Sequence, residues 1–413
     1  MSKANPFTPH SPVHTGMFVG RYFEIEALDK SLIQAKNSNP THLLILGERG
    51  IGKTSLLNLA QMFACGEFPW KDEKHNFLTV RISLDENICI ADLALNLRRA
   101  IEREISKENP EIAWLKKSWE FLSRFEAAGV AYRKEESANN SSQLIQEFIY
   151  SLIDTIKSLK DPTFVGQKKD GLVILIDEAD KASKNLNLGT FLKNLSEALI
   201  SENQNNILFI LSGLPNVRNV LIESHESSLR LFQELNLKPL SQEDTVNVIQ
   251  RGLDKSEKES GIKILVDEQA KKLFFLYSEG YPHFVQQIGF SAFEVNDDQL
   301  INETDVDTGF FGKHGALEQI GQRYYVRSFY TDIATDLQRE ILTIMSEKWN
   351  NWVSREQIKK KFTGKEYSLN NGIRALIDKG IIIPRDGVKG QYRLQWASFA
   401  FWIGNHNREK HRS

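Results

Sequence analysis

The sequence Gly47-Glu-Arg-Gly-Ile-Gly-Lys-Thr54 matches GxxxxGK[ST], a pattern that cradles phosphate groups. Glycines let the backbone N–H groups curve around a β-phosphate, because no Cβ stands in the way. Lys53 would reach the β- and γ-phosphates, and the Thr54 hydroxyl would ligate Mg²⁺. The helix beginning here would direct its positive end at the phosphates. The candidate nucleotide-binding residues of the loop are Gly47, Arg49, Gly50, Ile51, Gly52, Lys53, Thr54 and Ser55.

The flanks of this loop supply the context that the motif needs. Residues 41–46 are apolar and predict a short strand, and the pattern after Lys53 predicts a helix to about Ala64. The alternative is a glycine-rich turn that matches the motif by chance. The predicted strand before the loop and the predicted helix after it argue against this alternative. The loop therefore predicts ATP and Mg²⁺ as the cofactors.

A second motif, Leu172-Val-Ile-Leu-Ile-Asp177-Glu178, is an apolar strand that ends in two carboxylates. This is the Walker B arrangement, in which Asp177 would hold the magnesium through its water shell. Glu178 would orient and polarise the attacking water, which predicts ATP hydrolysis. Ordinary turn carboxylates at a strand end are the alternative.

Apolar strands alternate with helices up to about residue 238, which predicts a parallel α/β sheet. From Ser241 the pattern is helical. We predict an α/β P-loop NTPase sheet followed by a helical lid and a winged helix-turn-helix domain. The expected segments are a flexible arm at 1–16, an ATPase core at 17–238 with a helical insertion at about 109–170, a lid at 239–328 and a winged helix at 329–413.

Composition excludes some functional classes. The 413 residues are 41% hydrophobic and 26% charged, as in an ordinary globular protein, and the apolar runs are too short to span a membrane. Two cysteines form no metal-binding or disulfide pattern, which indicates a cytoplasmic protein. Net charge is −2, but residues 331–413 hold 15 Lys and Arg against nine Asp and Glu. That excess indicates an anionic partner or, equally, a lysine-rich solvated surface.

These motifs, together with Phe18-Val-Gly-Arg21, resemble the AAA+/STAND-type P-loop ATPases. The similarity is greatest to origin-recognition-like and related archaeal and bacterial ATPases with a C-terminal winged helix, and it covers roughly residues 17–400. It implies that Phe18, Val19 and Arg21 line the adenine pocket, unless this segment only packs on the core. It also implies a homo-oligomer or partner ATPase subunits.

The resemblance assigns further residues to catalysis. Ser212 would be the polar sensor at the end of the strand that the family places between the two Walker strands, although it could be an ordinary strand-end serine. An arginine finger acting on a neighbouring subunit would be Arg230 or Arg218, and either could instead form a surface salt bridge. Pro282, in Gly280-Tyr-Pro282, resembles the lid proline of STAND ATPases that borders the base, although this segment could be a plain helix–helix turn. The absence of a second-sensor arginine there favours slow hydrolysis over a fast motor.

The C-terminal segment reads as three helices followed by two strands around a Gly-rich turn, the pattern of a winged helix. The third helix, expected at Ser368–Lys379, would present Asn370, Asn371 and Arg374. The wing adds Arg385, Lys389 and Arg393. We therefore predict contact with double-stranded DNA through residues 354–393. The alternative is a signalling or assembly switch whose winged helix contacts protein.

Overall fold

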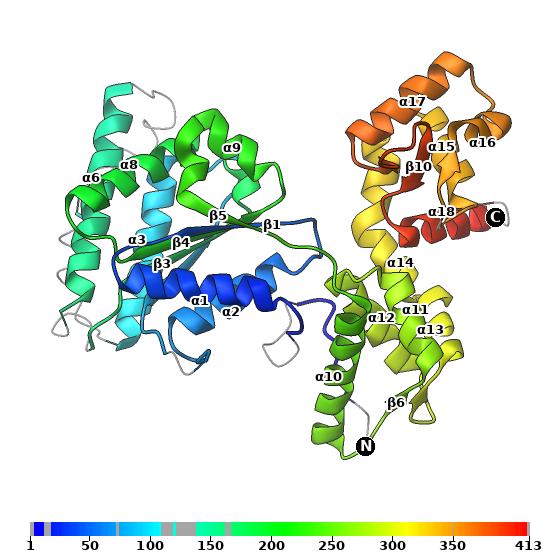
Figure 1. The fold of residues 1–413 in the computed structure, drawn as a ribbon, viewed down its shortest axis with the longest axis horizontal. Coiled ribbons are helices and arrows are strands. Elements are labelled where there is room, and N and C mark those ends of the chain that lie inside the picture. The colour runs from blue at the N-terminus through cyan, green and yellow to red at the C-terminus, as the bar shows by residue number, and fades with distance from the viewer. Residues whose placement is uncertain are drawn as a thin grey trace. The chain divides into compact units, whose positions relative to one another are not determined.

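The computed structural model describes residues 4–11, 18–71, 74–108, 119–120, 138–161, 167–349 and 351–410. The chain forms two compact units (Figure 1). The first unit spans Gly20–Lys238, and the second combines Met1–Val19 with Pro239–Ser413. Among the described residues, no helix has the length and apolar character needed to cross a membrane.

Gly20–Lys238 is built on a five-stranded sheet in which every pairing is parallel. Its strands are β1 (His42–Leu46), β2 (Leu78–Ser83), β3 (Leu172–Asp177), β4 (Ile207–Gly213) and β5 (Phe232–Asn236), in the order β2-β3-β4-β1-β5. β4 therefore lies between β1, which leads to the P-loop, and β3, which carries the Walker B residues. The register pairs Leu46 with Gly213 and Ser83 with Asp177, so the carboxyl ends of these strands share one edge. The predicted parallel α/β sheet is confirmed.

Helices cover both faces of this sheet, which explains why β1, β3 and β4 are buried along their whole length. The α-helices are α1 (Tyr22–Lys36), α2 (Lys53–Ala64), α3 (Ile90–Glu108), α6 (Ala138–Leu159), α8 (Leu188–Ser201) and α9 (Val217–Ser224). The described part of this unit also contains three short 3₁₀ helices, η2 (Ala179–Lys181), η3 (Lys184–Leu186) and η4 (Glu226–Leu231). The core on one face contains residues of α3, α6, α8 and α9, and α1 and α2 lie on the other (Figure 1). Of the helical insertion predicted at about 109–170, α6 is observed, and 109–118, 121–137 and 162–166 lie outside the described residues.

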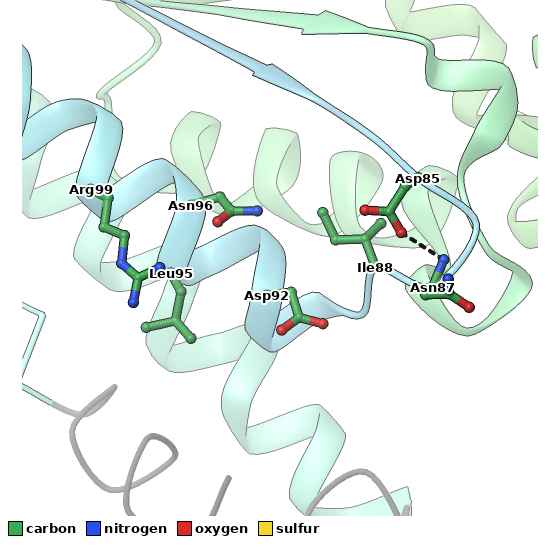
Figure 2. A pocket seen from close by; sticks show the side chains of 7 residues that line it. All are labelled: Asp85, Asn87, Ile88, Asp92, Leu95, Asn96 and Arg99. Carbon is green, nitrogen blue, oxygen red and sulfur yellow. Dashed lines mark hydrogen bonds between the residues drawn. The ribbon is translucent and has the colours of Figure 1, made fainter.

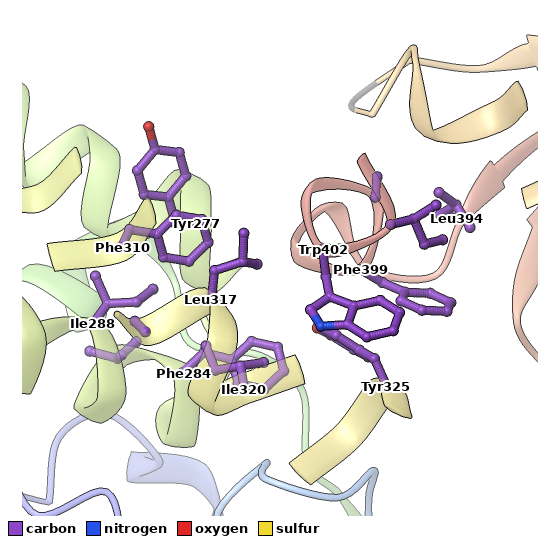
Figure 3. Packing of buried hydrophobic residues seen from close by; sticks show 14 of the residues in the cluster. Tyr277, Phe284, Ile288, Phe310, Leu317, Ile320, Tyr325, Leu394, Phe399 and Trp402 are labelled. Carbon is purple, nitrogen blue, oxygen red and sulfur yellow. The ribbon is translucent and has the colours of Figure 1, made fainter. Parts of the chain in front are cut away.

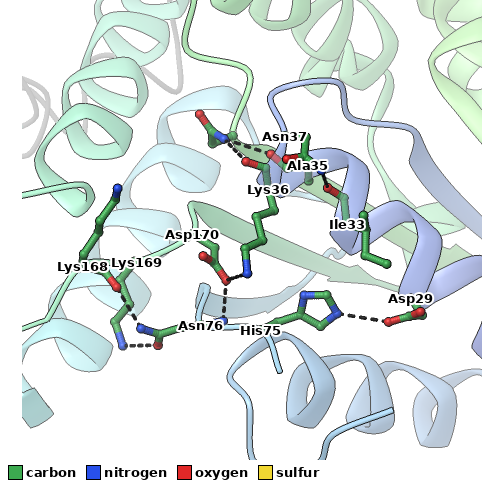
Figure 4. Close-up of polar contacts among 11 residues, drawn as sticks. Asp29, Ile33, Ala35, Lys36, Asn37, His75, Asn76, Lys168, Lys169 and Asp170 are labelled. Carbon is green, nitrogen blue, oxygen red and sulfur yellow. Dashed lines mark hydrogen bonds and ion pairs between the residues drawn. The ribbon is translucent and has the colours of Figure 1, made fainter. Parts of the chain in front are cut away.

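Polar contacts secure the opposite edge of the sheet, where the strands begin (Figure 4). The Asp170 carboxylate accepts a 2.8 Å hydrogen bond from the Asn76 N–H and lies 3.5 Å from the Lys36 amine. The buried His75 and Asp29 are in hydrogen-bond contact at 3.2 Å. These contacts join α1 to the segments that lead into β2 and β3. They lie at the end of the strands opposite to the P-loop.

The second unit begins with helices closed by side-chain caps. Ser241 Oγ accepts from the Asp244 N–H at 3.0 Å and Asp267 Oδ1 from the Ala270 N–H at 2.6 Å, which starts α10 and α11. Its first elements are α10 (Gln242–Ser260), β6 (Leu265–Val266), α11 (Glu268–Ser278), α12 (Pro282–Val295), β7 (Leu300–Ile301), α13 (Glu303–Phe311) and α14 (Ala316–Ile320). Two π-helical turns, η5 (Gly321–Tyr325) and η6 (Ser328–Asp332), lead to the C-terminal elements.

The C-terminal elements follow the predicted order of three helices and a wing. They are α15 (Asp336–Ser346), β8 (Val353–Ser354), α16 (Arg355–Lys361), α17 (Glu366–Asp378), β9 (Ile382–Pro384), β10 (Gln391–Leu394) and α18 (Ala397–Lys410). The strands form an antiparallel sheet in the order β8-β10-β9. The structure adds β8 and α18, which the sequence pattern did not predict. The third helix, α17, begins two residues before its expected start.

The predicted lid and winged helix share one hydrophobic core (Figure 3). Tyr325, in a π-helical turn, is fully buried, and its ring centroid lies 4.7 Å from that of Phe399 in α18. Gly321 is required at this junction, because a Cβ there would lie 2.1 Å from Nε1 of Trp402. The sequence pattern placed a domain limit between residues 328 and 329, where the structure has continuous packing.

The expected loose arm at residues 1–16 differs from what its described part, 4–11, shows. Phe7 is 2% exposed and its ring lies 6.4 Å from that of Phe293 in α12. The Thr8 N–H donates to Gln286 Oε1 at 3.0 Å, and the Asn5 side chain donates to the carbonyl of Phe290 at 3.0 Å. Burial of one aromatic side chain therefore orders this segment on α12. The other residues of the arm lie outside the described residues.

Candidate nucleotide-binding site

The P-loop connects the carboxyl end of β1 to the first turn of α2. Gly50 and Gly52 have φ angles of 79° and 99°, a backbone region that glycine adopts without strain. Gly52 is also the residue that immediately precedes α2, so the loop leads directly into the first turn of the helix. Backbone N–H groups at such a helix start are available to an anion. Arg49 is exposed, Ile51 is buried, and Ser55 lies in the first turn of α2.

The Lys53 amine lies inside the curve of this loop. Its Nζ donates to the carbonyl of Gly47 at 2.7 Å and to that of Glu48 at 3.0 Å. Burial lowers the pKa of Lys53, and the charges of Asp180 and Asp177 oppose that shift. A cation held this way, with little water around it, gains much from a phosphate oxygen beside it.

Arg21 attaches the residues before α1 to the P-loop. Its Nη2 donates to the carbonyl of Ile51 at 3.2 Å, and its Nη1 lies 3.4 Å from the Glu24 carboxylate. Arg21 has a φ of 65° and immediately precedes α1. The structure thus shows a contact of Arg21 with the phosphate loop, and its role toward the base stays a prediction.

Asp177 is the centre of the Walker B side, and its carboxylate is 9% exposed. Oδ1 accepts from the Ser212 hydroxyl at 2.5 Å and from the Glu178 N–H at 3.0 Å. Oδ2 accepts from the Thr54 hydroxyl at 3.2 Å and from Arg81 Nη2 at 2.5 Å. The two predicted metal residues, Thr54 and Asp177, are therefore in direct contact although 123 positions separate them in the chain.

Thr54 and Asp177 suit Mg²⁺ as a donor pair. Magnesium prefers oxygen ligands, and it is commonly held by one or two protein oxygens, water and the phosphates of a bound nucleotide. The described residues contain no group of three or more His, Cys, Asp or Glu arranged as a metal site. A metal held by Thr54 and Asp177 would take further ligands from water and from the nucleotide phosphates, as is common for Mg²⁺.

Glu178 follows Asp177 with a φ of 55° and an exposed side chain. Its Oε2 lies 2.8 Å from the Lys181 amine, and this contact raises the pKa of Lys181. The carboxylate of the predicted general base is thus paired with a lysine three residues further on. To polarise a water molecule, the Glu178 carboxylate would have to break its contact with Lys181 or accept both partners at once.

Ser212 is fully buried at the end of β4, and the structure places it against Asp177. Asp180, in turn, accepts from the Leu214 N–H at 3.0 Å, which holds the segment after β4 close to the segment after β3. The predicted sensor and the predicted metal residue therefore belong to one hydrogen-bonded group.

The two arginine-finger candidates have different surroundings. Arg218 pairs with Glu234 at 2.6 Å and donates to the Asn236 side chain at 2.8 Å, so it is bound within its own chain. Arg230 is exposed at the end of η4, and within the described residues no hydrogen bond or ion pair of its side chain is formed. Of these two candidates, Arg230 is the one that is exposed and makes no side-chain hydrogen bond or ion pair with the described residues.

Phe18, Val19 and Pro282 belong to the other unit, and their assignment to the base stays a prediction. Sequence reasoning missed Arg81 in β2 and Asn58 in α2, whose side chains are joined at 2.5 Å. The available signal was the position of Arg81: it is the only charged residue of β2, a strand that is otherwise mostly buried.

A pocket lies beyond the carboxyl end of β2, at the start of α3 (Figure 2). It measures about 250 Å³ and is lined by Asp85, Asn87, Ile88, Asp92, Leu95, Asn96 and Arg99. The Asn87 N–H donates to Asp85 at 2.8 Å, which shapes its rim. None of these residues belongs to the phosphate loop or to the Asp177 group.

Comparison with known proteins agrees with this geometry. Residues 35–221 match the model of a family described as AAA domain. This segment of the chain is similar to an AAA domain. It spans β1, β3 and β4 and therefore the P-loop, Asp177 and Ser212. The predicted resemblance to AAA-type P-loop ATPases is confirmed.

Solved structures resemble the whole chain in fold. A Walker-type ATPase of Pyrococcus abyssi superposes with a TM-score of 0.54 at 17% identity, covering 97% of this chain and 99% of that one. The ORC2 protein of Aeropyrum pernix, solved as ADPNP–ADP complexes, gives 0.55 at 12% identity and covers 95% of each chain. At these identities the similarity establishes the fold alone.

One curated relative is described as an uncharacterized HTH-type transcriptional regulator of Methanocaldococcus jannaschii. It is 25% identical over 260 residues, which are 61% of this chain. The match spans 57% of the relative's own length, so this chain corresponds to little more than half of it.

Proposed function

We propose that this chain binds ATP with Mg²⁺, hydrolyses it slowly and acts as a nucleotide-dependent switch on DNA. The observation that carries the nucleotide part is the contact between Thr54 and Asp177, which brings the two Walker motifs together. The P-loop N–H groups and Lys53 would hold the phosphates. Thr54 and Asp177 would hold the metal, whose charge would help to neutralise the charge that develops during phosphoryl transfer. Measured ATP binding and ATPase activity, with and without duplex DNA, test this proposal.

Hydrolysis would depend on Glu178 as the base that orients water, with Ser212 keeping Asp177 in place. Arg230 of one subunit would complete the site of a neighbour, which is why we propose a homo-oligomer or an assembly with partner ATPase subunits. Oligomer mass measured with ATP and with ADP tests this part. If the Arg230→Ala variant still forms the ATP-dependent assembly but hydrolyses ATP more slowly, Arg230 is supported as the arginine finger.

The DNA part rests on the surface of α17 and the wing. Tyr367 is 77% exposed, and Asn371 and Arg374 are exposed on the same helix. Between α17 and β10 lies a pocket of about 200 Å³ lined by Arg355, Asn370, Ile373, Arg374, Ile377 and Tyr392. In the wing, Arg385 and Arg393 lie over the Trp352 ring at 5.6 and 5.4 Å. Arginines and amides on such a surface can contact phosphates and base edges.

Replacing Arg374 with alanine is expected to weaken duplex binding about tenfold, because one contact to DNA commonly contributes 1–3 kcal/mol. The salt dependence of binding should also become shallower. Fluorescence anisotropy of a labelled duplex over a salt series measures both. The matched control is Lys348→Ala, which removes the same charge outside α17 and the wing and should change affinity less than threefold. Equal losses in both variants would refute a specific role for this helix.

The alternative, a switch whose winged helix contacts protein, has an observation in its favour. Glu366 at the start of α17 pairs with Arg355 at 2.6 Å and with Lys359 at 3.0 Å. These pairs neutralise two cations of α16 beside the start of α17, the helix that would approach DNA. Absence of duplex binding at low salt, together with nucleotide-dependent oligomer formation, would favour this alternative.

The switch part rests on Glu279, which immediately precedes Gly280-Tyr-Pro282. Its carboxylate accepts a 2.6 Å hydrogen bond from the Ala397 N–H at the start of α18. Burial raises the pKa of Glu279. The predicted base-bordering motif is therefore connected to the last helix of the winged-helix region, and a displacement of that motif would be transmitted to α18, which follows the wing strand β10.

Glu279→Ala is expected to lower the free energy of unfolding by about 1–3 kcal/mol, because it leaves the Ala397 N–H without its acceptor. Glu279→Gln keeps an acceptor oxygen and should lose less. Urea unfolding of the full chain, followed by circular dichroism, measures the difference. Glu259→Ala, which removes an exposed carboxylate of α10, is the control, and an equal loss there would show that the Glu279 bond contributes nothing particular.

A further inference from the structure

Arg81 occupies an unusual place in the α/β unit. It is the fourth residue of β2 and the only charged one, and its side chain is 25% exposed. The register of the sheet pairs Arg81 with Leu175 of β3, two residues before Asp177. From there its guanidinium extends to the Asp177 carboxylate, which Nη2 contacts at 2.5 Å. None of the phosphate-binding motifs includes this residue.

Arg81 contacts Oδ2 of Asp177, the carboxylate oxygen that would be offered to the metal. Asp177 Oδ2 also accepts the Thr54 hydroxyl at 3.2 Å, so it is the oxygen through which the two predicted magnesium residues meet. The other oxygen, Oδ1, is already used by Ser212 and by the Glu178 N–H. With two donors on each oxygen, the carboxylate has little capacity left for a further cation.

A second contact holds the guanidinium in this position. Arg81 Nη1 donates to Asn58 Oδ1 at 2.5 Å, and Asn58 lies on α2, the helix that begins at Lys53. The guanidinium is thus fixed between α2 and β3 by two side chains. A planar group held at two points loses little additional freedom in keeping its carboxylate contact, which makes it an effective competitor for that carboxylate.

We propose that Arg81 is a positioning residue that competes with Mg²⁺ for the Asp177 carboxylate and thereby sets the magnesium concentration at which nucleotide is bound in its magnesium form. A metal held by Thr54 and Asp177, directly or through its water shell, would approach the oxygen that the guanidinium occupies, and the two cations would repel each other. The guanidinium would then have to leave Oδ2 or to share it. This inference rests on the proposed binding of ATP with Mg²⁺.

The test measures nucleotide binding rather than turnover. A fluorescent ATP analogue is bound to the full chain in EDTA and then titrated with MgCl₂, which gives the half-saturating Mg²⁺ concentration. In Arg81→Gln this concentration is expected to fall on the order of tenfold, because a charge-assisted contact that opposes the metal is lost. Arg81→Lys keeps the positive charge and should stay closer to the wild type.

The matched control is Arg98→Gln. Arg98 is another arginine in an ion pair, 2.9 Å from Glu102 on α3, with a side chain 20% exposed, and it does not contact Asp177. Its loss should leave the half-saturating Mg²⁺ concentration unchanged. Thermal unfolding of each variant is recorded in parallel. If Arg81→Gln does not fold, Asn58→Ala takes its place, because it releases one side of the guanidinium and should lower the same concentration by a smaller factor.

The possible outcomes separate the two proposals. A half-saturating Mg²⁺ concentration that is unchanged or raised in Arg81→Gln, or in Asn58→Ala where that variant is used, overturns the competition. A raised value would mean that Arg81 supports the metal site instead. Failure of the wild-type chain to bind the analogue at any Mg²⁺ concentration would overturn the proposed nucleotide function. A lowered value in Arg81→Gln with an unchanged control supports the inference.

Discussion

Lys53→Ala is expected to weaken ATP binding by roughly 100-fold or more. The Lys53 amine lies within the P-loop, where it donates to the Gly47 and Glu48 carbonyls. Two charge-assisted contacts to phosphate oxygens would be lost, each contributing about 1.5–3 kcal/mol. Isothermal titration calorimetry with ATP and Mg²⁺ measures the affinity, and ATPase activity should fall below detection at the same nucleotide concentration.

The control for this substitution is Lys30→Ala. Lys30 is an exposed lysine of α1 that lies 3.3 Å from Glu26, and its removal changes the net charge by the same amount. ATP affinity should stay within about twofold of the wild type, because exposed ion pairs contribute little. If Lys53→Ala bound ATP as tightly as Lys30→Ala did, the assignment of the P-loop as the nucleotide site would fail.

The sequence was sufficient to predict the residues of the two Walker motifs and the strands that carry them. Each motif is local: glycine spacing identifies the P-loop, and an apolar run ending in Asp177-Glu178 identifies the second strand. The place of Ser212 depended on the family pattern, which puts β4 between β1 and β3. The observed strand order agrees with that pattern.

The contacts between distant residues could not be predicted in the same way. Arg81 reaches Asp177 because β2 and β3 pair in a register that places Ser83 opposite Asp177. The local sequence pattern of two parallel strands does not predict the register in which they pair. Similarly, Phe7 orders the N-terminal segment through burial against a helix more than 270 positions away, and local composition suggested a loose arm. The shared core of the predicted lid and the predicted winged helix depends on Tyr325 and α18, and hydrophobic periodicity alone did not indicate their contact.

Glu178→Gln is expected to retain ATP and to lose turnover by about 100-fold or more, the contribution that a positioned general base commonly makes. The amide keeps the size of the side chain but cannot accept a proton from water. Glu202→Gln is the control, because Glu202 is also a glutamate paired with a lysine, 3.1 Å from Lys157, and it lies outside the site. Its turnover should stay within about twofold of the wild type.

The pair between Glu178 and Lys181 makes this experiment more informative. A general base held by a lysine is available to water only when that contact opens, so Lys181→Ala should leave turnover equal to or higher than that of the wild type. Single-turnover hydrolysis of γ-labelled ATP measures all three variants under the same conditions. A Glu178→Gln variant that hydrolyses ATP at the wild-type rate would move the catalytic assignment away from Glu178. A Lys181→Ala variant as slow as Glu178→Gln would instead show that the ion pair itself is required for turnover.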